Sequence, residues 1–224
     1  MFALDMTTLR VILRLLLFTC VGMSFLSTPL LAAGPAVEKT GALTAAVPPD
    51  VAKAVEDNGY RVTLDDGWSA DFWFARSLAT VNSAAAGALY PDFANGEFVG
   101  VVTFSKGASD FRGQALSAGT YTLRYQYIPQ DANHMGVSPN PDFLLAIPAA
   151  TDTNPADNLP LKRLVTLSAK STGTAHPAVF AMAPAGTTAS VVKDDQSMTV
   201  FTVVVPTSDG KPEKIGIILK GQAM

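Results

Sequence analysis

Short segments in which apolar and polar residues alternate run through most of the chain, separated by turns rich in glycine, proline, asparagine and aspartate. The clearest is 119–128, where tyrosines and Leu123 alternate with Thr120, Thr122, Arg124 and Gln126. A period of two residues predicts a β-strand with one core face and one solvent face. Further strands are expected at 60–64, 68–74, 97–104, 142–148, 178–184, 189–193, 198–206 and 213–221.

Two of these segments carry further information about their place in a sheet. Asp66 and Gly67 lie between two strand-like runs and predict a hairpin turn. In the second run, Phe72 and Phe74 are expected on one face and Trp73 on the other. The segment 97–104 is apolar on both faces, which is typical of a central, covered strand.

Helical patterns are few. Prolines followed by Val51 and Val55 on one face predict a short helix at 49–57. Apolar residues at helical spacing from Leu161 to Ser168, followed by Gly173, predict a second helix, with a strand at 164–170 as the alternative. The segment 75–96 has no clear period and is expected to be a surface connection. The sequence therefore favours an all-β protein, an antiparallel β-sandwich of immunoglobulin-like or jelly-roll-like type with one or two short helices.

The N-terminal residues resemble an export signal. Arg10 and Arg14 precede an apolar run, and small residues follow it, with cleavage expected between Ala33 and Ala36. The alternative is an uncleaved helix that anchors the protein to the membrane. We thus expect a signal peptide at 1–33, a flexible tether at 34–47 and a single β-sandwich domain at 48–224, in the periplasm or secreted.

Charge and cysteine content narrow the function. The chain has 16 basic and 19 acidic residues, and removing 1–33 leaves 14 and 18, a net charge of −4. No basic cluster is present, so a nucleic-acid partner is not expected. Removal of 1–33 also removes Cys20, the chain's single cysteine, which excludes thiolate catalysis and cysteine-ligated metals from the mature protein.

The two histidines are candidate metal ligands. His134 and His176 each lie in a turn-like segment before a strand, and Asp131 or Asp142 could complete a set of two histidines and one carboxylate. Such a set suits copper, iron or zinc. The alternative is that no cofactor binds and each imidazole holds its own loop through hydrogen bonds to the backbone.

A second candidate surface combines Asp110, Arg112 and Arg124, which could bind an anionic ligand because guanidinium groups recognise carboxylates. The alternative is that Arg112 pairs with Asp110 or with a carbonyl oxygen and braces the connection before the strand at 120.

Several motifs resemble those of a family of uncharacterised exported bacterial proteins: DFRG at 110–113, AGTYTLRY at 118–125, NHMGVSPNPDFLL at 133–145 and TGTAHPA at 172–178. The resemblance covers the chain from about Gly59 to its end. It implies an extracytoplasmic protein and assigns no activity, substrate or cofactor.

Together these patterns favour an exported binding or envelope-assembly module over an enzyme, with an envelope protein or a small ligand as its partner. A metal-binding protein built on His134 and His176 is the first alternative. A hydrolase with an acidic pair is the second, since such pairs are assembled by the fold and leave no spacing signal.

Overall fold

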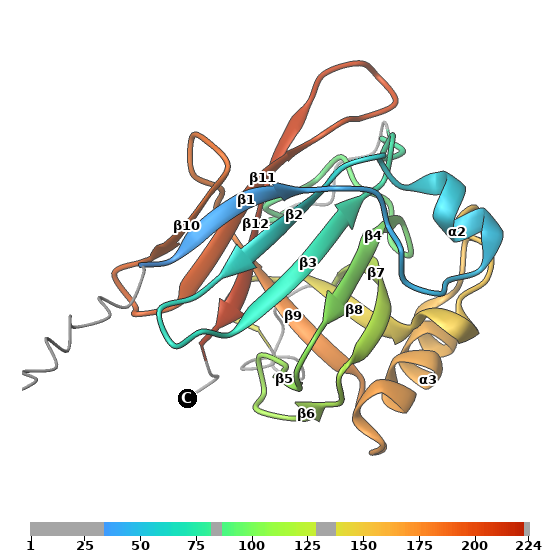
Figure 1. Ribbon diagram of the computed structural model, residues 1–224. Helices are drawn as coiled ribbons and strands as arrows, with labels where there is room; N and C mark the ends of the chain where they lie inside the picture. Colours follow the sequence, from blue (N-terminus) through green and yellow to red (C-terminus); the bar gives the residue numbers. More distant parts are fainter. Residues whose placement is uncertain (1–33, 82–86, 129–137, 222–224) are drawn as a thin grey trace, which may run out of the picture. The chain divides into compact units, whose positions relative to one another are not determined.

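A single antiparallel sheet of ten strands forms the body of the protein (Figure 1). The computed structural model describes residues 34–81, 87–128 and 138–221, and the predicted signal segment lies outside them. Within these ranges, the strand order is β1-β2-β3-β4-β7-β8-β9-β12-β11-β10. The strands are β1 (Ala36–Thr40), β2 (Gly59–Thr63), β3 (Ser69–Phe74), β4 (Phe98–Phe104), β7 (Gly119–Tyr127), β8 (Asp142–Pro148), β9 (Ala178–Ala183), β10 (Ser190–Lys193), β11 (Thr199–Val205) and β12 (Glu213–Lys220).

The sheet curls until its two edge strands, β1 and β10, come near each other, so that it is nearly closed into a barrel. The prediction of an all-β, antiparallel fold is confirmed. Phe201 of β11 contacts Phe72 and Phe74 of β3, with ring centroids 5.2 and 6.2 Å apart, although the two strands are far apart in the sheet order. The two halves of the sheet therefore face each other across an aromatic core, as the two layers of a sandwich do.

Side chains from alternate positions of several strands fill this interior. Leu123 and Tyr125 of β7, Phe180 and Met182 of β9, and Ile217 of β12 belong to the same buried cluster. Trp73 takes the opposite side of β3 from Phe72 and Phe74, as predicted, and its indole Nε1 donates to the Gly41 carbonyl oxygen at 2.9 Å.

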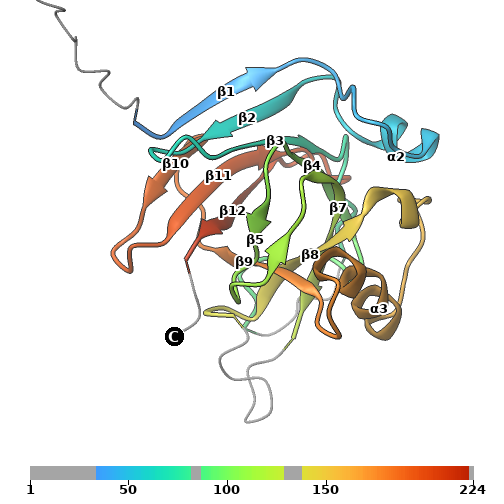
Figure 2. The ribbon, with the colours of Figure 1, turned by 60° about the horizontal axis from the view of Figure 1, so that its bottom comes forward.

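Two small layers lie outside the sheet. Helix α3 (Leu161–Thr172) packs on β8 and β9 and, with Leu164 and Leu167, covers the outward side chains of β8 (Figure 2). The hairpin of β5 (Ala108–Ser109) and β6 (Ala115–Leu116) places Phe111 against Val200 and Ile218. The remaining helices are α2 (Pro49–Ala54) and the short 3-10 helix η1 (Ala149–Thr151).

Both predicted helices are present. Helix α2 is one turn shorter than expected because Val55 is already extended. Helix α3 ends at Gly173, which adopts φ 65° and donates its N–H to the Ala169 carbonyl oxygen. Within the described ranges, no helix is both long and apolar enough to cross a bilayer.

The prediction of one wet face on β7 is wrong. Thr122, Arg124 and Gln126 are 0, 0 and 1% exposed. Polarity alone suggested solvent contact, but the segment that follows β8 folds over this face and supplies hydrogen-bond partners, as described below for Arg124.

The prediction of a tether at 34–47 is also wrong in its first part. Residues 36–40 form β1, which pairs with β2 over five residues from Ala36↔Thr63 to Thr40↔Gly59. Val37, Leu43 and Val47 pack against the core. The sequence did not predict this edge strand, because only one of its faces contacts the protein and most of its residues are small or charged.

The described parts of 75–96 are likewise more than a surface connection. Leu78, Tyr90 and Phe93 are 0, 5 and 5% exposed and belong to the main core. Large buried residues at such irregular spacing give no periodic signal, so the sequence did not predict their burial.

Candidate functional site

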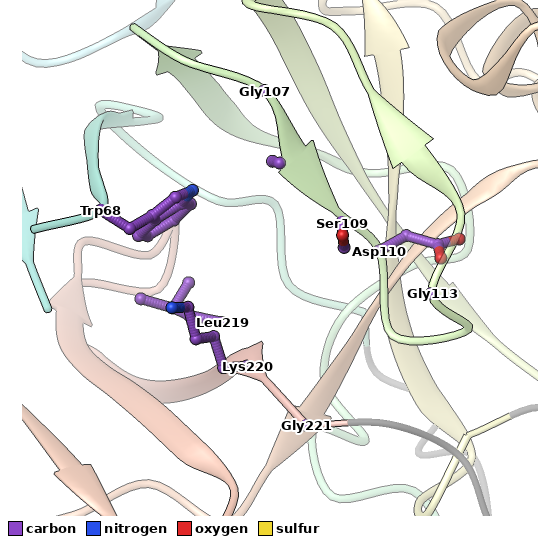
Figure 3. Close-up of a pocket in the computed structure, with 9 residues that line it drawn as sticks. Trp68, Gly107, Ser109, Asp110, Gly113, Leu219, Lys220 and Gly221 are labelled. Atoms are coloured by element: carbon purple, nitrogen blue, oxygen red, sulfur yellow. The ribbon is translucent and has the colours of Figure 1, made fainter. Parts of the chain in front are cut away.

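A pocket of about 730 Å³ lies between three separate segments of the chain. One wall is Trp68, directly before β3. A second is the run from Gly107 through Asp110 to Gly113, which forms β5 and the turn after it. The third is the end of β12 and the residues that follow, Leu219–Gly221. Figure 3 shows Trp68, Leu219 and Lys220 on one side of an open space and Ser109 and Asp110 on the other.

Trp68 is held at the mouth of the pocket by the turn that precedes it. Gly67 adopts φ 75°, and the Trp68 backbone N–H donates to Asp66 Oδ1 at 3.0 Å. The indole leans on Phe104, with ring centroids 5.9 Å apart, and stays half-buried. Among the described residues, none accepts a hydrogen bond from its Nε1, and the nitrogen lies at the tip of the ring that reaches into the open space (Figure 3). The pocket thus offers a fixed aromatic face with an available donor.

The ammonium group on the pocket wall is already paired. Lys220 Nζ contacts Asp66 Oδ2, and this hydrogen bond lowers the pKa of the Asp66 carboxyl below its ordinary value. The neighbouring residue Asp65 forms a looser pair with Lys193 of β10, at 3.7 Å. The two ion pairs link the β2–β3 turn, which precedes Trp68, to β12 and β10.

Asp110 is also fully engaged. Its Oδ1 accepts from the backbone N–H groups of Arg112 and Gln114, at 3.0 and 2.8 Å, and its Oδ2 accepts from Gln114 Nε2 and the Val179 N–H, at 2.8 and 3.1 Å. The side chain is 2% exposed. Asp110 therefore shapes the β5–β6 turn and ties it to β9, and its carboxylate has no oxygen left for a ligand.

The predicted anion surface of Asp110, Arg112 and Arg124 is wrong for Arg124. This guanidinium is 0% exposed and pairs with Asp152 through two hydrogen bonds, at 2.9 and 2.7 Å. Its remaining donors reach the carbonyl oxygens of Gly96, Asn154, Pro155 and Asp157. Arg112 Nη2 contacts the Pro177 carbonyl oxygen at 3.4 Å, in agreement with the alternative that it braces the loop.

Of the predicted metal ligands, the structure describes Asp142 and His176, and these two residues lie far apart. Asp131 and His134 lie outside the described residues, and their part of the prediction stays a prediction. Asp142 opens β8, whereas His176 precedes β9, and the register Ala146↔Ala178 puts them at opposite ends of this antiparallel pair, about 15–20 Å apart along the strands. In the described ranges, no three histidine, cysteine, aspartate or glutamate side chains are grouped as metal ligands. His176 itself is exposed, and its backbone bonds to Thr172 and Thr174.

Asp142 has a structural role instead. Its buried carboxylate accepts from the N–H groups of Leu89 and Tyr90, at 2.8 and 3.0 Å, and from the Tyr125 hydroxyl at 2.6 Å. Burial raises the pKa of Tyr90 to about 12 and that of Tyr125 further still. Both phenols therefore stay protonated over the physiological range, and the Tyr125 hydroxyl remains a donor to Asp142.

The Asp142→Asn variant tests this role. An amide keeps the shape but replaces one acceptor oxygen by a donor that faces another donor. We expect the free energy of unfolding to fall by about 1–3 kcal/mol in urea titrations. The control is Asp92→Asn, an exposed aspartate near Leu89 and Tyr90 in sequence, with an expected change within about 0.5 kcal/mol. A variant with unchanged stability but reduced metal content would return Asp142 to the list of ligands.

Sequence reasoning missed the three side chains that give the pocket its character: Trp68, Ser109 and Lys220. The available signal was Trp68, a large aromatic residue directly after an Asp-Gly turn, where a core residue is not required. Ser109 and Lys220 gave no signal, because only the curled sheet brings their segments to the same place.

Comparisons with known proteins found no match to this chain among family models, curated proteins or solved structures.

Proposed function

We propose that this protein is exported from the cytoplasm and binds a small molecule in the Trp68 pocket. The observation that carries the proposal is the pocket itself, whose volume of about 730 Å³ falls in the range of ligand sites in proteins. The basic, apolar and small-residue pattern of residues 1–33 supports export.

The lining residues favour binding over catalysis. General acid–base or nucleophilic chemistry needs a side chain whose reactive atom is free to exchange a proton or attack a substrate. Both Asp110 oxygens accept two hydrogen bonds each, and the Lys220 ammonium is paired with Asp66. Ser109 has no histidine or unengaged carboxylate among the described residues that line the pocket. These groups suit a protein that holds a molecule without changing it.

A variant that fills the pocket tests the proposal. Ser109→Trp places a large side chain in the open space from an exposed position, so we expect the fold to survive. In saturation-transfer NMR with a library of small polar and aromatic compounds, we expect a set of compounds to bind the wild-type protein and to lose binding in this variant.

The matched control is Ser117→Trp, an exposed serine after β6 that does not line the pocket. This variant should keep every interaction of the wild-type protein. The proposal is overturned if no compound in the library binds the Ser117→Trp variant more strongly than the Ser109→Trp variant.

A further inference from the structure

We infer that the ligand of the Trp68 pocket is a neutral saccharide of one or two rings. This inference rests on the proposed function and names the class of molecule that the site would take. Three independent features of the pocket lead to it: its charges, its aromatic wall and its polar groups.

The charged side chains on the described walls of the pocket are already engaged within the protein. Asp110 is satisfied by four donors, and Lys220 is paired with Asp66. A charged ligand gains affinity and specificity from an opposite charge that the free site leaves unpaired. Among the described residues that line the pocket, the positive charge of Lys220 already has a counter-charge in Asp66, and the Asp110 carboxylate already accepts four hydrogen bonds. The site therefore fits a molecule without net charge.

The aromatic wall requires a ligand with an apolar face. The indole of Trp68 is half-buried and fixed by its turn and by Phe104, so its position is set before any ligand arrives. A pre-positioned aromatic ring loses little conformational freedom on binding. One face of a sugar ring is made of C–H groups and can lie flat on an indole, which joins an apolar surface to a polar N–H.

The polar groups of the pocket favour a ligand with hydroxyl groups around its apolar face. The Nε1–H of Trp68 reaches into the open space, and the exposed Ser109 hydroxyl stands on the opposite wall without a hydrogen-bond partner among the described residues (Figure 3). Gly107, Gly113 and Gly221 carry no side chain, so backbone groups are accessible on two walls. Donors and acceptors thus surround a central apolar surface. The chain of a fatty acid would contact only the indole face. A saccharide can lie on the indole face and also form hydrogen bonds with the surrounding polar groups.

Isothermal titration calorimetry of the wild-type protein tests the ligand class directly. The probes are glucose, galactose, N-acetylglucosamine and their β-1,4-linked disaccharides, against the charged analogues glucuronate and glucosamine and the fatty-acid anion decanoate. For at least one neutral saccharide we expect a dissociation constant between about 10 µM and 1 mM, as befits ligands of this size. Its charged analogue is expected to bind at least about tenfold more weakly, because the pocket has no charge to receive it.

Trp68 variants locate the binding. Trp68→Ala removes the stacking face and the donor and is expected to weaken binding about 30-fold or more, whereas Trp68→Phe keeps a face and should weaken it about 3- to 10-fold. The protein has two tryptophans, and Trp73 is buried. In the Trp73→Phe variant, a change in fluorescence on adding the saccharide therefore reports from Trp68 alone. Circular dichroism checks that each variant is folded.

The outcomes separate this inference from the proposed function. Tighter binding of glucuronate, glucosamine or decanoate, lost in Ser109→Trp, overturns the saccharide and leaves a small-molecule pocket. Failure of every saccharide to bind at roughly 50 mM also overturns the inference. The proposed function then stands only when other compounds still distinguish Ser109→Trp from Ser117→Trp. Saccharide binding that survives both Trp68→Ala and Ser109→Trp would place the sugar elsewhere and overturn this site.

Discussion

Replacing Asp152 by alanine is expected to lower the free energy of unfolding by about 3–5 kcal/mol, because it leaves a buried guanidinium without its counter-charge. Arg124 and Asp152 are 0 and 2% exposed in their side chains, and their closest atoms, Nη2 and Oδ1, are 2.7 Å apart. The Thr122 hydroxyl, which donates to Asp152 Oδ2 at 2.7 Å, loses its acceptor as well. Urea unfolding followed by circular dichroism measures the loss.

The protein supplies a matched control for this measurement. Arg61 and Asp71 form the same two-bond geometry, with Arg61 Nε and Nη2 each 2.7 Å from a carboxylate oxygen, but the Arg61 side chain is 53% exposed. Asp71→Ala is expected to cost about 1 kcal/mol or less, because water replaces the lost partner. Equal losses in the two variants would contradict the structural role assigned to the buried pair.

Phe201→Ala is expected to cost about 3–5 kcal/mol, since it opens a cavity where the two halves of the sheet meet. The Phe201 side chain is 0% exposed and contacts the rings of Tyr60, Phe72 and Phe74 at centroid distances of 5.2–6.2 Å. Backbone hydrogen bonds hold the surrounding strands to their neighbours, so these strands have little room to collapse into the cavity. Thermal and urea unfolding of the variant give the measurement.

Val204→Ala, on the same strand, is the control. Val204 is 39% exposed and faces outward, so its truncation removes little buried surface, and we expect a change of at most about 1 kcal/mol. A Phe201→Ala protein as stable as Val204→Ala would mean that the two halves of the sheet do not depend on this aromatic contact.

The sequence predicted the parts of the fold that obey a local rule. Period two located β7, short apolar runs between turns located β8 and β9, and the helical spacing followed by Gly173 located α3 with its end. In each case the residues that define the element lie next to one another in the chain. Their pattern is therefore complete without knowledge of the partner strand.

The predictions that failed concern residues whose contact partners are distant in the sequence. Arg124 was placed on a wet face because its acceptors, Asp152 to Asp157, come about thirty residues later and carry no signal that they fold back over β7. The candidate pocket depends on Trp68, Ser109 and Lys220, which belong to three separate segments. Only the curvature of the sheet decides that these segments meet, and curvature has no single-sequence pattern.

The strand order also bears on how the chain reaches this structure. From β1 to β9, each strand of the sheet pairs with the sheet strand before it in sequence, and β10, β11 and β12 form a second such series. Pairings between near neighbours close short loops and form early, whereas distant pairings carry a larger entropic cost. Between β9 and β12, where the two series join in the sheet, the paired residues are Ala183↔Gly216 and Met182↔Ile217. The Trp68 pocket takes its walls from both series, since Trp68 and Ser109 belong to the first and Leu219 to Gly221 belong to or follow the second. The pocket is therefore complete only when the two series have joined.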